Sequence, residues 1–471
     1  MTPSSNQLDP VLQHIDDNAD DRLTRLFDFL RIKSISTDPA YSNECADAAD
    51  GLSSELNQIG FKSRVVQTEG HPIVLAHKQA SDPKTPHILF YGHYDVQPVD
   101  PLALWKSDPF DPQVIQRDDG TSFIRARGAS DDKGQLRTFL EACRAWQDVA
   151  DGLPCTVTVF IEGEEETGAP SMPQFLKTYG DELKRADFAV ACDTSMWERS
   201  APAIVISLRG LVSGELTLKG PSRDLHSGLY GGAARNPIHV LSNILGRLWD
   251  ENGRVMLDGF YDDINDVDGV LKETLSRIDF DEAAFLNSVG LSESAGENNC
   301  SVLEKIWLRP TAEINGISGG YNGAGFKTVI PSEASAKISF RLVPGQDPDR
   351  VWSSFEEFVR LYCPKDVEAS FTKIASDAAH AMCTDHAALR QASQSLSDEW
   401  GQAPLLMGIG GSIPVVKDIK RHLGLETILV GFALDDDAIH SPNEKYELES
   451  FEKGTRSWAR ILSSFSRTQS T

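Results

Sequence analysis

The stretch that decides the fold is Val157-Thr-Val-Phe-Ile-Glu162-Gly-Glu-Glu-Glu166-Thr-Gly168, in which an apolar run ends in four carboxylates. Its β-branched and aromatic part predicts a strand that is buried on both faces, as in a parallel sheet. The carboxylates then lie where the strand leaves the sheet, which is where open α/β folds bind their ligands. Because neighbouring carboxylates repel one another, this stretch indicates either a cation site or a solvated acidic loop.

The same pattern recurs along the chain and favours the cation site. The strand His87–Tyr91 runs into His93 and Asp95, which strand alternation places on one side of the chain. Two later segments deliver the carboxylates Asp131 and Asp193, the second directly after the apolar run that precedes it. A repeated placement of histidine and carboxylate after apolar strands is hard to obtain by chance.

Bulk composition excludes several classes of protein. The chain has 471 residues, of which 40% are hydrophobic and 24% charged, as expected for a soluble globular protein of two or three domains. Its formal net charge of -25 argues against nucleic acid or an anionic membrane as a partner. No apolar run approaches the roughly 20 residues of a membrane helix, and the polar N-terminus lacks the features of a signal peptide. We therefore expect a cytoplasmic location.

The cysteines agree with that location. The chain has seven, an odd number, and they are scattered without a C-x-x-C pair. This pattern is typical of free thiols in a reducing compartment rather than of a disulfide framework or a cysteine-ligated metal.

Element order predicts two domains. Helical spacing of apolar residues predicts an N-terminal helix over Asp20–Ile32. From about residue 208 the expected order becomes β-α-β-β-α-β, the split βαβ unit, interrupted by an acidic and irregular insertion over 253–299. We expect a catalytic domain formed by residues 1–207 and 379–471, with a second domain, 208–378, inserted into it.

Five side chains form the candidate metal site: His93, Asp131, Glu166, Asp193 and His440. Two imidazoles and three carboxylates suit zinc, cobalt or manganese. Five ligands are too many for one catalytic ion with an open position, but they fit two ions that share a carboxylate. A further carboxylate that binds no metal is then needed to move the proton of an activated water, and Glu165 is the candidate.

Five motifs together resemble the di-zinc metallopeptidases of the aminoacylase–carnosinase type, closest to the branch of the cytosolic non-specific dipeptidases and carnosine dipeptidases. In order, the motifs are Tyr91-Gly-His-Tyr-Asp-Val-Gln-Pro98, Arg127-Gly-Ala-Ser-Asp-Asp-Lys-Gly134, Glu162-Gly-Glu-Glu-Glu-Thr-Gly168, Asp224-Leu-His-Ser-Gly228 and Gly410-Gly-Ser-Ile-Pro414. The resemblance implies an α/β catalytic domain with a mostly parallel central sheet. It also implies an inserted α+β, ferredoxin-like lid and dimerisation domain.

The resemblance assigns a role to each metal-site residue. It makes Asp131 the bridging ligand, with His93 and Asp193 on one ion and Glu166 and His440 on the other. The ions are expected to be Zn²⁺, with Mn²⁺ or Co²⁺ as alternatives. Asp95 is implied to orient the His93 imidazole, and Glu165 to act as general base and acid.

It also implies a homodimer through the inserted domain. His226 is expected to reach the partner subunit's site and to stabilise an oxyanion there. Thr328, Arg341 and Ser412 match positions that contact substrate, and the Arg341 guanidinium suits a terminal carboxylate.

One departure from the dipeptidase branch bears on the substrate. Relatives of that branch usually carry Arg-Glu immediately before Gly-Gly-Ser, whereas this chain has Gly408 and Ile409. Because the missing Glu removes a partner for a free α-ammonium group, an N-acylated or otherwise blocked amide becomes more plausible.

Three functions therefore remain open. The leading hypothesis is an amide hydrolase acting on dipeptides or small peptide-like substrates. The second keeps the chemistry but changes the substrate to an N-acyl amino acid or a C-terminal residue, as in aminoacylases and carboxypeptidases. The third is a non-catalytic binding protein, whose signature would be the loss of Glu165 or of a metal ligand, and none is lost.

Overall fold

The computed structural model describes residues 7–262, 264, 269–411 and 413–466. The chain divides into two compact units, described separately here. Unit 1 comprises Met1–Ile206, Met382–Leu406 and Pro414–Thr471, and unit 2 comprises Ser207–Ala381 and Met407–Ile413. The domain expected over 208–378 has nearly the limits of the main segment of unit 2, which additionally takes in the short segment from Met407.

A mixed sheet forms the centre of unit 1 and has the order β1-β2-β6-β3-β7-β17-β8-β15, with β16 also pairing with β8. The four strands β6, β3, β7 and β17 are mutually parallel, which agrees with the mostly parallel centre expected from sequence. The deciding stretch forms β6 (Thr156–Glu162), which is buried along its whole length. The other strands are β1 (Lys62–Val66), β2 (Ile73–Lys78), β3 (His87–His93), β7 (Phe188–Ala191), β8 (Ala203–Leu208), β15 (His380–Ala381), β16 (Leu405–Ile409) and β17 (Thr427–Leu429).

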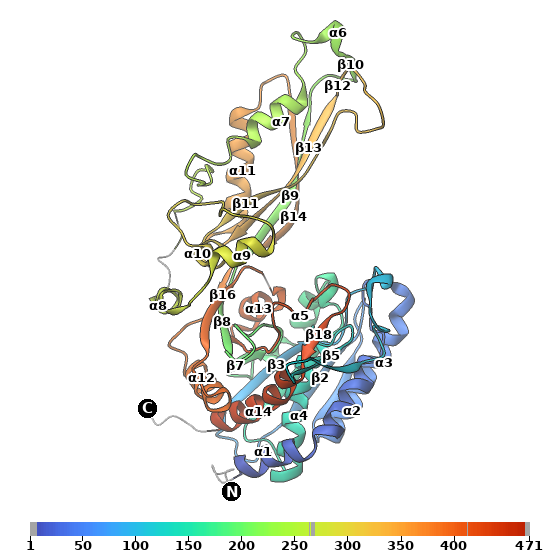
Figure 1. The fold of residues 1–471 in the computed structure, drawn as a ribbon, viewed down its shortest axis with the longest axis vertical. Coiled ribbons are helices and arrows are strands. Elements are labelled where there is room, and N and C mark those ends of the chain that lie inside the picture. The colour runs from blue at the N-terminus through green and yellow to red at the C-terminus, as the bar shows by residue number, and fades with distance from the viewer. Residues whose placement is uncertain (1–6, 263, 265–268, 412, 467–471) are drawn as a thin grey trace. The chain divides into compact units, whose positions relative to one another are not determined.

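Helices of unit 1 pack on this sheet and on one another (Figure 1). Helix α4 contacts α1, α2 and α14, and α14 also contacts α12. Aromatic rings fill the layer between α4, α14 and β3: Phe90 stacks on Phe139 at 3.6 Å between ring centroids, and Trp458 meets both rings edge-on. These helices are α1 (Leu8–Asp17), α2 (Ala19–Leu30), α4 (Lys133–Ala150), α12 (Ala387–Trp400) and α14 (Leu448–Phe465).

The remaining elements of unit 1 are short or peripheral. Helix α3 (Ser42–Gln58) packs on β1 and β2, and α5 (Met172–Leu183) packs on α13 (Pro414–Asp418). A small sheet has the order β18-β5-β4 and is formed by Lys445–Glu447, Ser122–Arg125 and Gln113–Gln116.

The helix expected over Asp20–Ile32 is present as α2 (Ala19–Leu30), and a further helix that was not expected precedes it. The structure has two helices there, α1 and α2, separated at Asn18. In α1, Val11, Leu12 and Ile15 lie at helical spacing and are buried. The sequence analysis missed this apolar pattern because most residues around it are acidic or polar.

Unit 2 contains an antiparallel sheet of order β11-β13-β9-β14, with helices α7 and α11 along one face (Figure 1). The strands are β9 (Gly210–Lys219), β11 (Thr311–Gly319), β13 (Glu333–Leu342) and β14 (Glu368–Asp377), and the helices are α7 (Pro237–Leu245) and α11 (Pro348–Tyr362). The chain order β9-α7-β11-β13-α11-β14 is the split βαβ unit predicted from sequence.

Alternation along the strands separates the two faces of this sheet. In β9 and β13 every second residue is buried, and these residues, among them Leu216 and Phe340, pack against Leu241 of α7 and Phe355 of α11. The residues between them lie on the face that α7 and α11 do not cover. That uncovered face carries Arg341.

Two features of unit 2 lie outside the sheet. The insertion expected to be irregular contains α8 (Gly269–Arg277) and α9 (Glu282–Ser288) and is followed by α10 (Val302–Trp307). A two-stranded ribbon is formed by β10 (Leu225–His226) and β12 (Val329–Ile330), with the short helix α6 (Ser227–Tyr230) beside it. Across the described residues of both units, no helix combines the length and the apolar character needed to cross a membrane.

Candidate metal centre

Three of the predicted ligands follow neighbouring parallel strands. His93 is the last residue of β3, Asp193 comes two residues after β7, and Glu166 lies in a short 3₁₀ turn after β6. Because β6, β3 and β7 are adjacent and parallel, their carboxyl ends lie at the same edge of the sheet. Asp131 lies just before α4, and His440 comes from the loop between β17 and β18.

These five side chains form two groups that share Asp131. The first group is His93, Asp131 and Asp193, with His93 Nε2 3.1 Å from Asp131 Oδ1 and 3.8 Å from Asp193 Oδ2. In the second group, His440 Nε2 lies 2.8 Å from Asp131 Oδ2 and 3.1 Å from Glu166 Oε2. Each oxygen of the Asp131 carboxylate therefore faces a different group.

Asp95 contacts residues of both ligand groups. Its backbone oxygen and its Oδ1 lie 3.2 and 3.4 Å from His93 Nδ1, so the Nε2 atom of that ring is turned toward Asp131. The Asp95 carboxylate also accepts hydrogen bonds from the backbone N–H groups of Glu165 and Glu166, at 3.3 and 3.1 Å. Ser36 donates its hydroxyl to the same carboxylate at 2.6 Å. Asp95 thus fixes a histidine and the turn that carries Glu165 and Glu166.

The charges of the cluster fit bound cations. Burial, reinforced by the Asp131 carboxylate, raises the pKa of Asp193 to about 7. Burial and the carboxylates around it likewise raise the pKa of Glu165 to about 8. Hydrogen bonds to Asp131 and Glu166 raise the pKa of His440 to about 10. Such a concentration of negative charge needs positive charge to offset it, and imidazole with carboxylate is a donor set for divalent metal ions. Each of the two groups could hold one metal ion.

Glu444 supports Asp131 and was missed by the sequence analysis as a contributor to the site. Its fully buried carboxylate accepts hydrogen bonds from Arg127 Nη1 at 2.7 Å and from the backbone N–H groups of Gly128, Ser130 and Asp131 at 2.8, 2.9 and 3.1 Å. One side chain therefore holds the whole loop that presents the shared carboxylate. Glu444 is also four residues from His440 in sequence.

The carboxylates around Glu165 and Glu166 have structural partners. Glu162 accepts from the Tyr91 hydroxyl at 2.7 Å, and Glu164 accepts from the backbone N–H groups of His71 and Ser171. Asp132 accepts from the backbone N–H of His93 at 3.2 Å. The Glu165 carboxylate accepts no such hydrogen bond from any described residue, and the side chain is half-buried beside the two groups.

In unit 2 the structure brings two of the expected substrate residues together. His226 and Thr328 are both exposed and adjacent: His226 pairs with Val329 across the ribbon, and the Thr328 carbonyl accepts from the backbone N–H of Ser227. Arg341 lies elsewhere, near the end of β13. The fourth expected residue, Ser412, is outside the described residues.

Both departures noted in the sequence, Gly408 and Ile409, lie in unit 2, and Gly408 is closely packed. A Cβ atom at Gly408 would lie 3.1 Å from the Cβ of Trp307, at the end of α10, so a side chain there meets the wall of that helix. Ile409 is half-buried, and its carbonyl accepts a hydrogen bond from the Arg209 backbone N–H at 3.4 Å. A side chain at position 408 would therefore require Trp307 to shift by a few tenths of an ångström.

Comparison with known proteins agrees with this geometry. The chain is 29% identical over 467 residues to the Cys-Gly metallodipeptidase dug1 of Schizosaccharomyces pombe, covering 95% of this chain and 96% of that protein. It is 27% identical to the Beta-Ala-His dipeptidase of Rattus norvegicus, with 99% and 97% covered. Among solved structures, the metallo-carboxypeptidase Sso-CP2 of Sulfolobus solfataricus aligns with a TM-score of 0.81 and 29% identity over 94% of this chain and 99% of that one.

A model of Peptidase family M20/M25/M40 matches residues 89–464, a range that contains all five predicted ligands and Glu165. The third hypothesis, a non-catalytic binding protein, is wrong. The relatives are peptidases, and the five predicted ligands and Glu165 are all present. The chain belongs to peptidase family M20/M25/M40 and is a metal-dependent peptidase.

Proposed function

We propose that this enzyme hydrolyses the peptide bond of dipeptides and of similarly small peptide-like amides, with two zinc ions as its cofactors. The observation that carries the proposal is the pair of ligand groups that share Asp131. The activities named for the Schizosaccharomyces pombe and Rattus norvegicus relatives, which match nearly the whole chain, support the substrate class.

The ligands divide between the ions as the two groups do. We assign His93 and Asp193 to one ion, Glu166 and His440 to the other, and Asp131 to both. When bound, two such ions supply Lewis acidity that polarises an amide carbonyl and makes water more acidic. Zinc is preferred because it accepts imidazole and carboxylate ligands alike, and manganese or cobalt would fit the same set.

Glu165 is the proposed general base and acid. It takes a proton from the attacking water and delivers it to the leaving nitrogen, which must be protonated before the products separate. A carboxylate suits both steps, because it can take up a proton and return it. Asp95 acts as a positioning residue through its contacts to His93 and to the turn that carries Glu165.

The substrate residues in unit 2 are proposed to come from two copies of the chain. From Glu333 to Arg341, β13 extends roughly 26 Å at about 3.3 Å per residue, and the ribbon with His226 and Thr328 lies before its first residue. An extended dipeptide spans only about 7 Å. A single copy cannot place all three side chains on one dipeptide, whereas a homodimer can supply His226 and Thr328 from one copy and Arg341 from the other. Ser412 is proposed to contact substrate as well.

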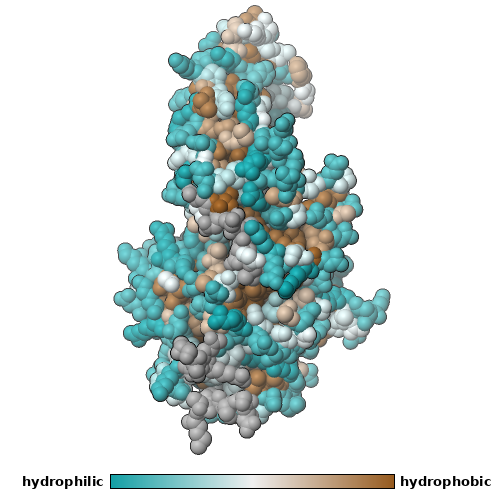
Figure 2. Space-filling view, turned by 90° about the vertical axis from the view of Figure 1, so that its left-hand side faces the viewer, coloured by the Kyte–Doolittle hydropathy of each residue, from teal (hydrophilic) through white to brown (hydrophobic). Residues whose placement is uncertain are grey.

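Exposed apolar side chains beside His226 support an association through this part of unit 2. Leu229 is 78% exposed, Phe326 is 91% exposed and Tyr230 is 42% exposed. Figure 2 shows the brown and tan atoms at the end of unit 2 that carries α6, β10 and β12 in Figure 1. Apolar groups of this size gathered at one place are typical of protein–protein contacts.

Mixing two inactive variants tests the dimer. A His226→Ala subunit and a Glu165→Gln subunit, refolded together, should regain about one active site per heterodimer if His226 acts on the partner subunit's site. Separately tagged subunits establish that heterodimers are present. If purified heterodimers stay as inactive as either parent, the His226 proposal is wrong.

A second candidate substrate is an N-acyl amino acid. Ile409 stands where dipeptidase relatives carry Glu, and an apolar side chain provides no partner for a charged ammonium group. The likeness to a carboxypeptidase is compatible with either substrate, because both carry a terminal carboxylate. A cytoplasmic location is proposed from the seven cysteines, all of which are free.

The test of the proposed function is hydrolysis by protein stripped of metal and then reloaded. Chelated protein should be inactive on free dipeptides, and zinc, manganese or cobalt should restore activity to different extents. Parallel assays with the N-acetylated forms of the same dipeptides separate the two substrate classes. Hydrolysis that persists after complete metal removal would overturn the proposal.

A further inference from the structure

A cluster of three carboxylates in unit 1 surrounds the ammonium group of Lys445, the first residue of β18. The Lys445 Nζ donates to Asp436 Oδ1 and Asp437 Oδ1, each at 2.8 Å, and to Glu447 Oε1 at 2.9 Å. Oxygen atoms of these three carboxylates lie within 4.8 Å of one another, which is close enough for a single cation. Lys445 therefore takes the place that a metal ion could have in this cluster.

The buried part of the cluster depends on Lys445 for its positive charge. Asp437 and Glu447 are both buried, and Glu447 also accepts two hydrogen bonds from Arg117, at 2.7 and 2.5 Å. Asp436 is 66% exposed, so water can stabilise its charge. Among the described residues, Lys445 is the cation that pairs with Asp437. Without Lys445, the Asp437 carboxylate would be a buried charge without a partner.

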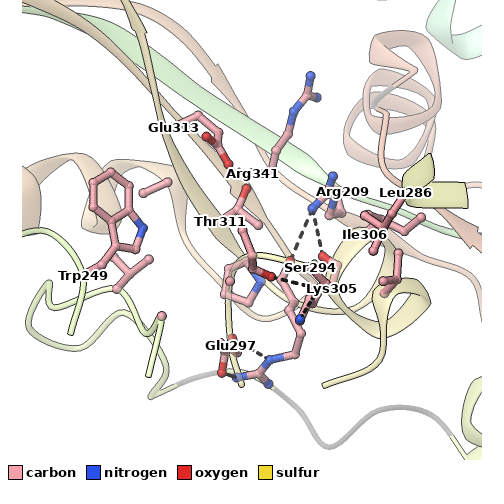
Figure 3. Close-up of a pocket in the computed structure, with 18 of the residues that line it drawn as sticks. Arg209, Trp249, Leu286, Ser294, Glu297, Lys305, Ile306, Thr311, Glu313 and Arg341 are labelled. Carbon is pink, nitrogen blue, oxygen red and sulfur yellow. Dashed lines mark hydrogen bonds and ion pairs between the residues drawn. The ribbon is translucent and has the colours of Figure 1, made fainter. Parts of the chain in front are cut away.

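Lys445 is held differently from a half-buried cation of unit 2, Arg209, which lines a cavity of about 630 Å³ (Figure 3). Arg209 donates to the backbone carbonyls of Gly410, Lys305 and Arg309, at 3.2, 3.3 and 3.4 Å. A neutral carbonyl that loses such a donor is left without a hydrogen bond. A buried carboxylate that loses its cation is left with an uncompensated charge, which costs more free energy. Loss of the Lys445 charge should therefore disturb the surrounding loop strongly.

Asp437 connects this ammonium group to the loops that carry two metal ligands. Its Oδ2 accepts from the Ser130 hydroxyl at 2.7 Å and from the backbone N–H of Leu434 at 2.8 Å. Its backbone carbonyl accepts from the backbone N–H of Lys445 at 2.9 Å. Ser130 directly precedes the shared ligand Asp131. Asp437 thus joins the loop before α4 to the loop between β17 and β18.

The segment from Asp437 to Lys445 carries His440 and has an unusual backbone. Ala438, His440 and Asn443 have φ values of 56°, 59° and 67°, in the left-handed region that residues other than glycine rarely adopt. Such conformations persist only where surrounding contacts impose them. Lys445 supplies two of these contacts, because its backbone N–H and its ammonium group both bind Asp437.

The loop that carries Asp131 has a second, independent support. The Glu444 carboxylate accepts hydrogen bonds from the backbone N–H groups of Gly128, Ser130 and Asp131. Loss of the Lys445 ammonium group leaves these bonds intact. The segment that carries the second imidazole should therefore be released while the shared carboxylate stays in place.

We propose that Lys445 is a positioning residue for the metal ion that His440 binds. Its ammonium group is a fixed internal cation that holds Asp437 and, through it, the segment with His440. The other ion depends less on Lys445, because its ligands His93 and Asp193 follow strands of the central sheet. The inference rests on the proposed function for the division of the ligands between two ions.

Metal binding by the full-length protein tests this role. Wild type, Lys445→Met and Asp437→Asn are loaded with Zn²⁺, and the affinity for each ion is measured by competition with a chelator. In both variants the affinity for one ion should fall about 10–100-fold, and that for the other should change by less than about threefold. The Co²⁺ absorption spectrum of the ion that remains should match that of His440→Ala. Asp437→Asn carries the test if circular dichroism shows that Lys445→Met does not fold.

Asp436→Asn is the matched control. Asp436 accepts from the same ammonium group at 2.8 Å and lies next to Asp437, but it is 66% exposed. The same substitution at this position should leave the affinity for both ions at the wild-type value.

Any of three results would overturn the role of Lys445. The first is wild-type affinity for both ions in a folded Lys445→Met or Asp437→Asn variant. The second is an equal loss of both ions in these variants. The third is an equal effect of Asp436→Asn and Asp437→Asn, because local charge rather than position would then explain the change. Wild type that binds fewer than two ions would instead contradict the proposed function, and the inference with it.

Discussion

The Glu444 carboxylate accepts a hydrogen bond from the backbone N–H of Asp131 at 3.1 Å, although the two residues lie 313 positions apart in the sequence. Together with its bonds to Gly128 and Ser130, this contact makes Glu444 the support of the loop that presents the shared carboxylate. A ligand that must face two ions has to be held in one orientation, and residues that orient ligands typically change metal affinity 10–100-fold when they are replaced.

We therefore predict that Glu444→Gln loses metal more readily than wild type. The amide keeps the shape of the side chain, but it leaves the buried Arg127 without a counter-charge. We expect metal affinity to fall about 10–100-fold, as measured by competition with a chelator, while circular dichroism stays native. Glu449→Gln, on the exposed start of α14, is the control and should keep wild-type affinity. Equal affinities in the two variants would show that Glu444 does not support the metal site.

Glu165 and Glu166 are expected to differ in role although they are neighbours. Glu165→Gln should keep both metal ions and lose about 10²–10⁴-fold in kcat, because it removes the proton carrier alone. Glu166→Gln should instead lower the metal content, since Glu166 belongs to a ligand group. Elemental analysis beside kinetics separates the two. An empty Glu165 variant and a full Glu166 variant would mean that the roles are reversed.

Much of this site could be predicted because the ligands follow apolar strands directly. The run before Glu162 indicates a buried strand, and adjacency of parallel strands then brings His93, Glu166 and Asp193 to one edge. The support by Glu444 could not be predicted, because it depends on contacts to residues more than 300 positions away. A glutamate in a loop has the same local signal whether it is solvated or buried against backbone N–H groups.

The misread elements have a similar origin. In the insertion after Gly253, α8 and α9 are only 9 and 7 residues long, so each of them gives little periodic signal in the sequence. The sequence shows a glycine at position 408. It does not show that Trp307 lies close to this position in the folded chain.

Substrate preference should respond to residue 409. Ile409→Glu places a carboxylate where dipeptidase relatives carry one, which provides a partner for a free ammonium group. We expect the ratio of kcat/KM for free over N-acetylated dipeptides to rise about tenfold, corresponding to about 1.4 kcal/mol. Ile409→Gln introduces a side chain of nearly the same size as glutamate but without its charge. This variant should keep the ratio near the wild-type value. If both variants change the ratio alike, charge at residue 409 does not select the substrate.

Stability at acid pH should depend on Glu55. Despite its burial, ion pairs with Arg137 and Arg144 lower the pKa of Glu55 from its ordinary value of 4.5 to about 2. The stabilisation is therefore fully present above about pH 4.5 and is lost as the pH falls toward 2. It should amount to about 3 kcal/mol at neutral pH.

Thermal unfolding of Glu55→Gln checks this dependence. The variant should melt below wild type at pH 7, and the difference should shrink as the pH approaches 2, because a protonated Glu55 resembles Gln. Asp50→Asn, an exposed change in the same helix, should follow wild type at both pH values. A difference between wild type and Glu55→Gln that does not change with pH would contradict the role of the Glu55 charge.

The most direct test of the two-ion site with a shared ligand is the metal content of Asp131→Asn after exhaustive desalting. Wild type should hold about two divalent ions per chain. Because each oxygen of the Asp131 carboxylate faces a different ligand group, we predict that the variant loses both ions together, along with its peptidase activity. A variant that retains one full equivalent of tightly bound metal would contradict a ligand shared between the two ions.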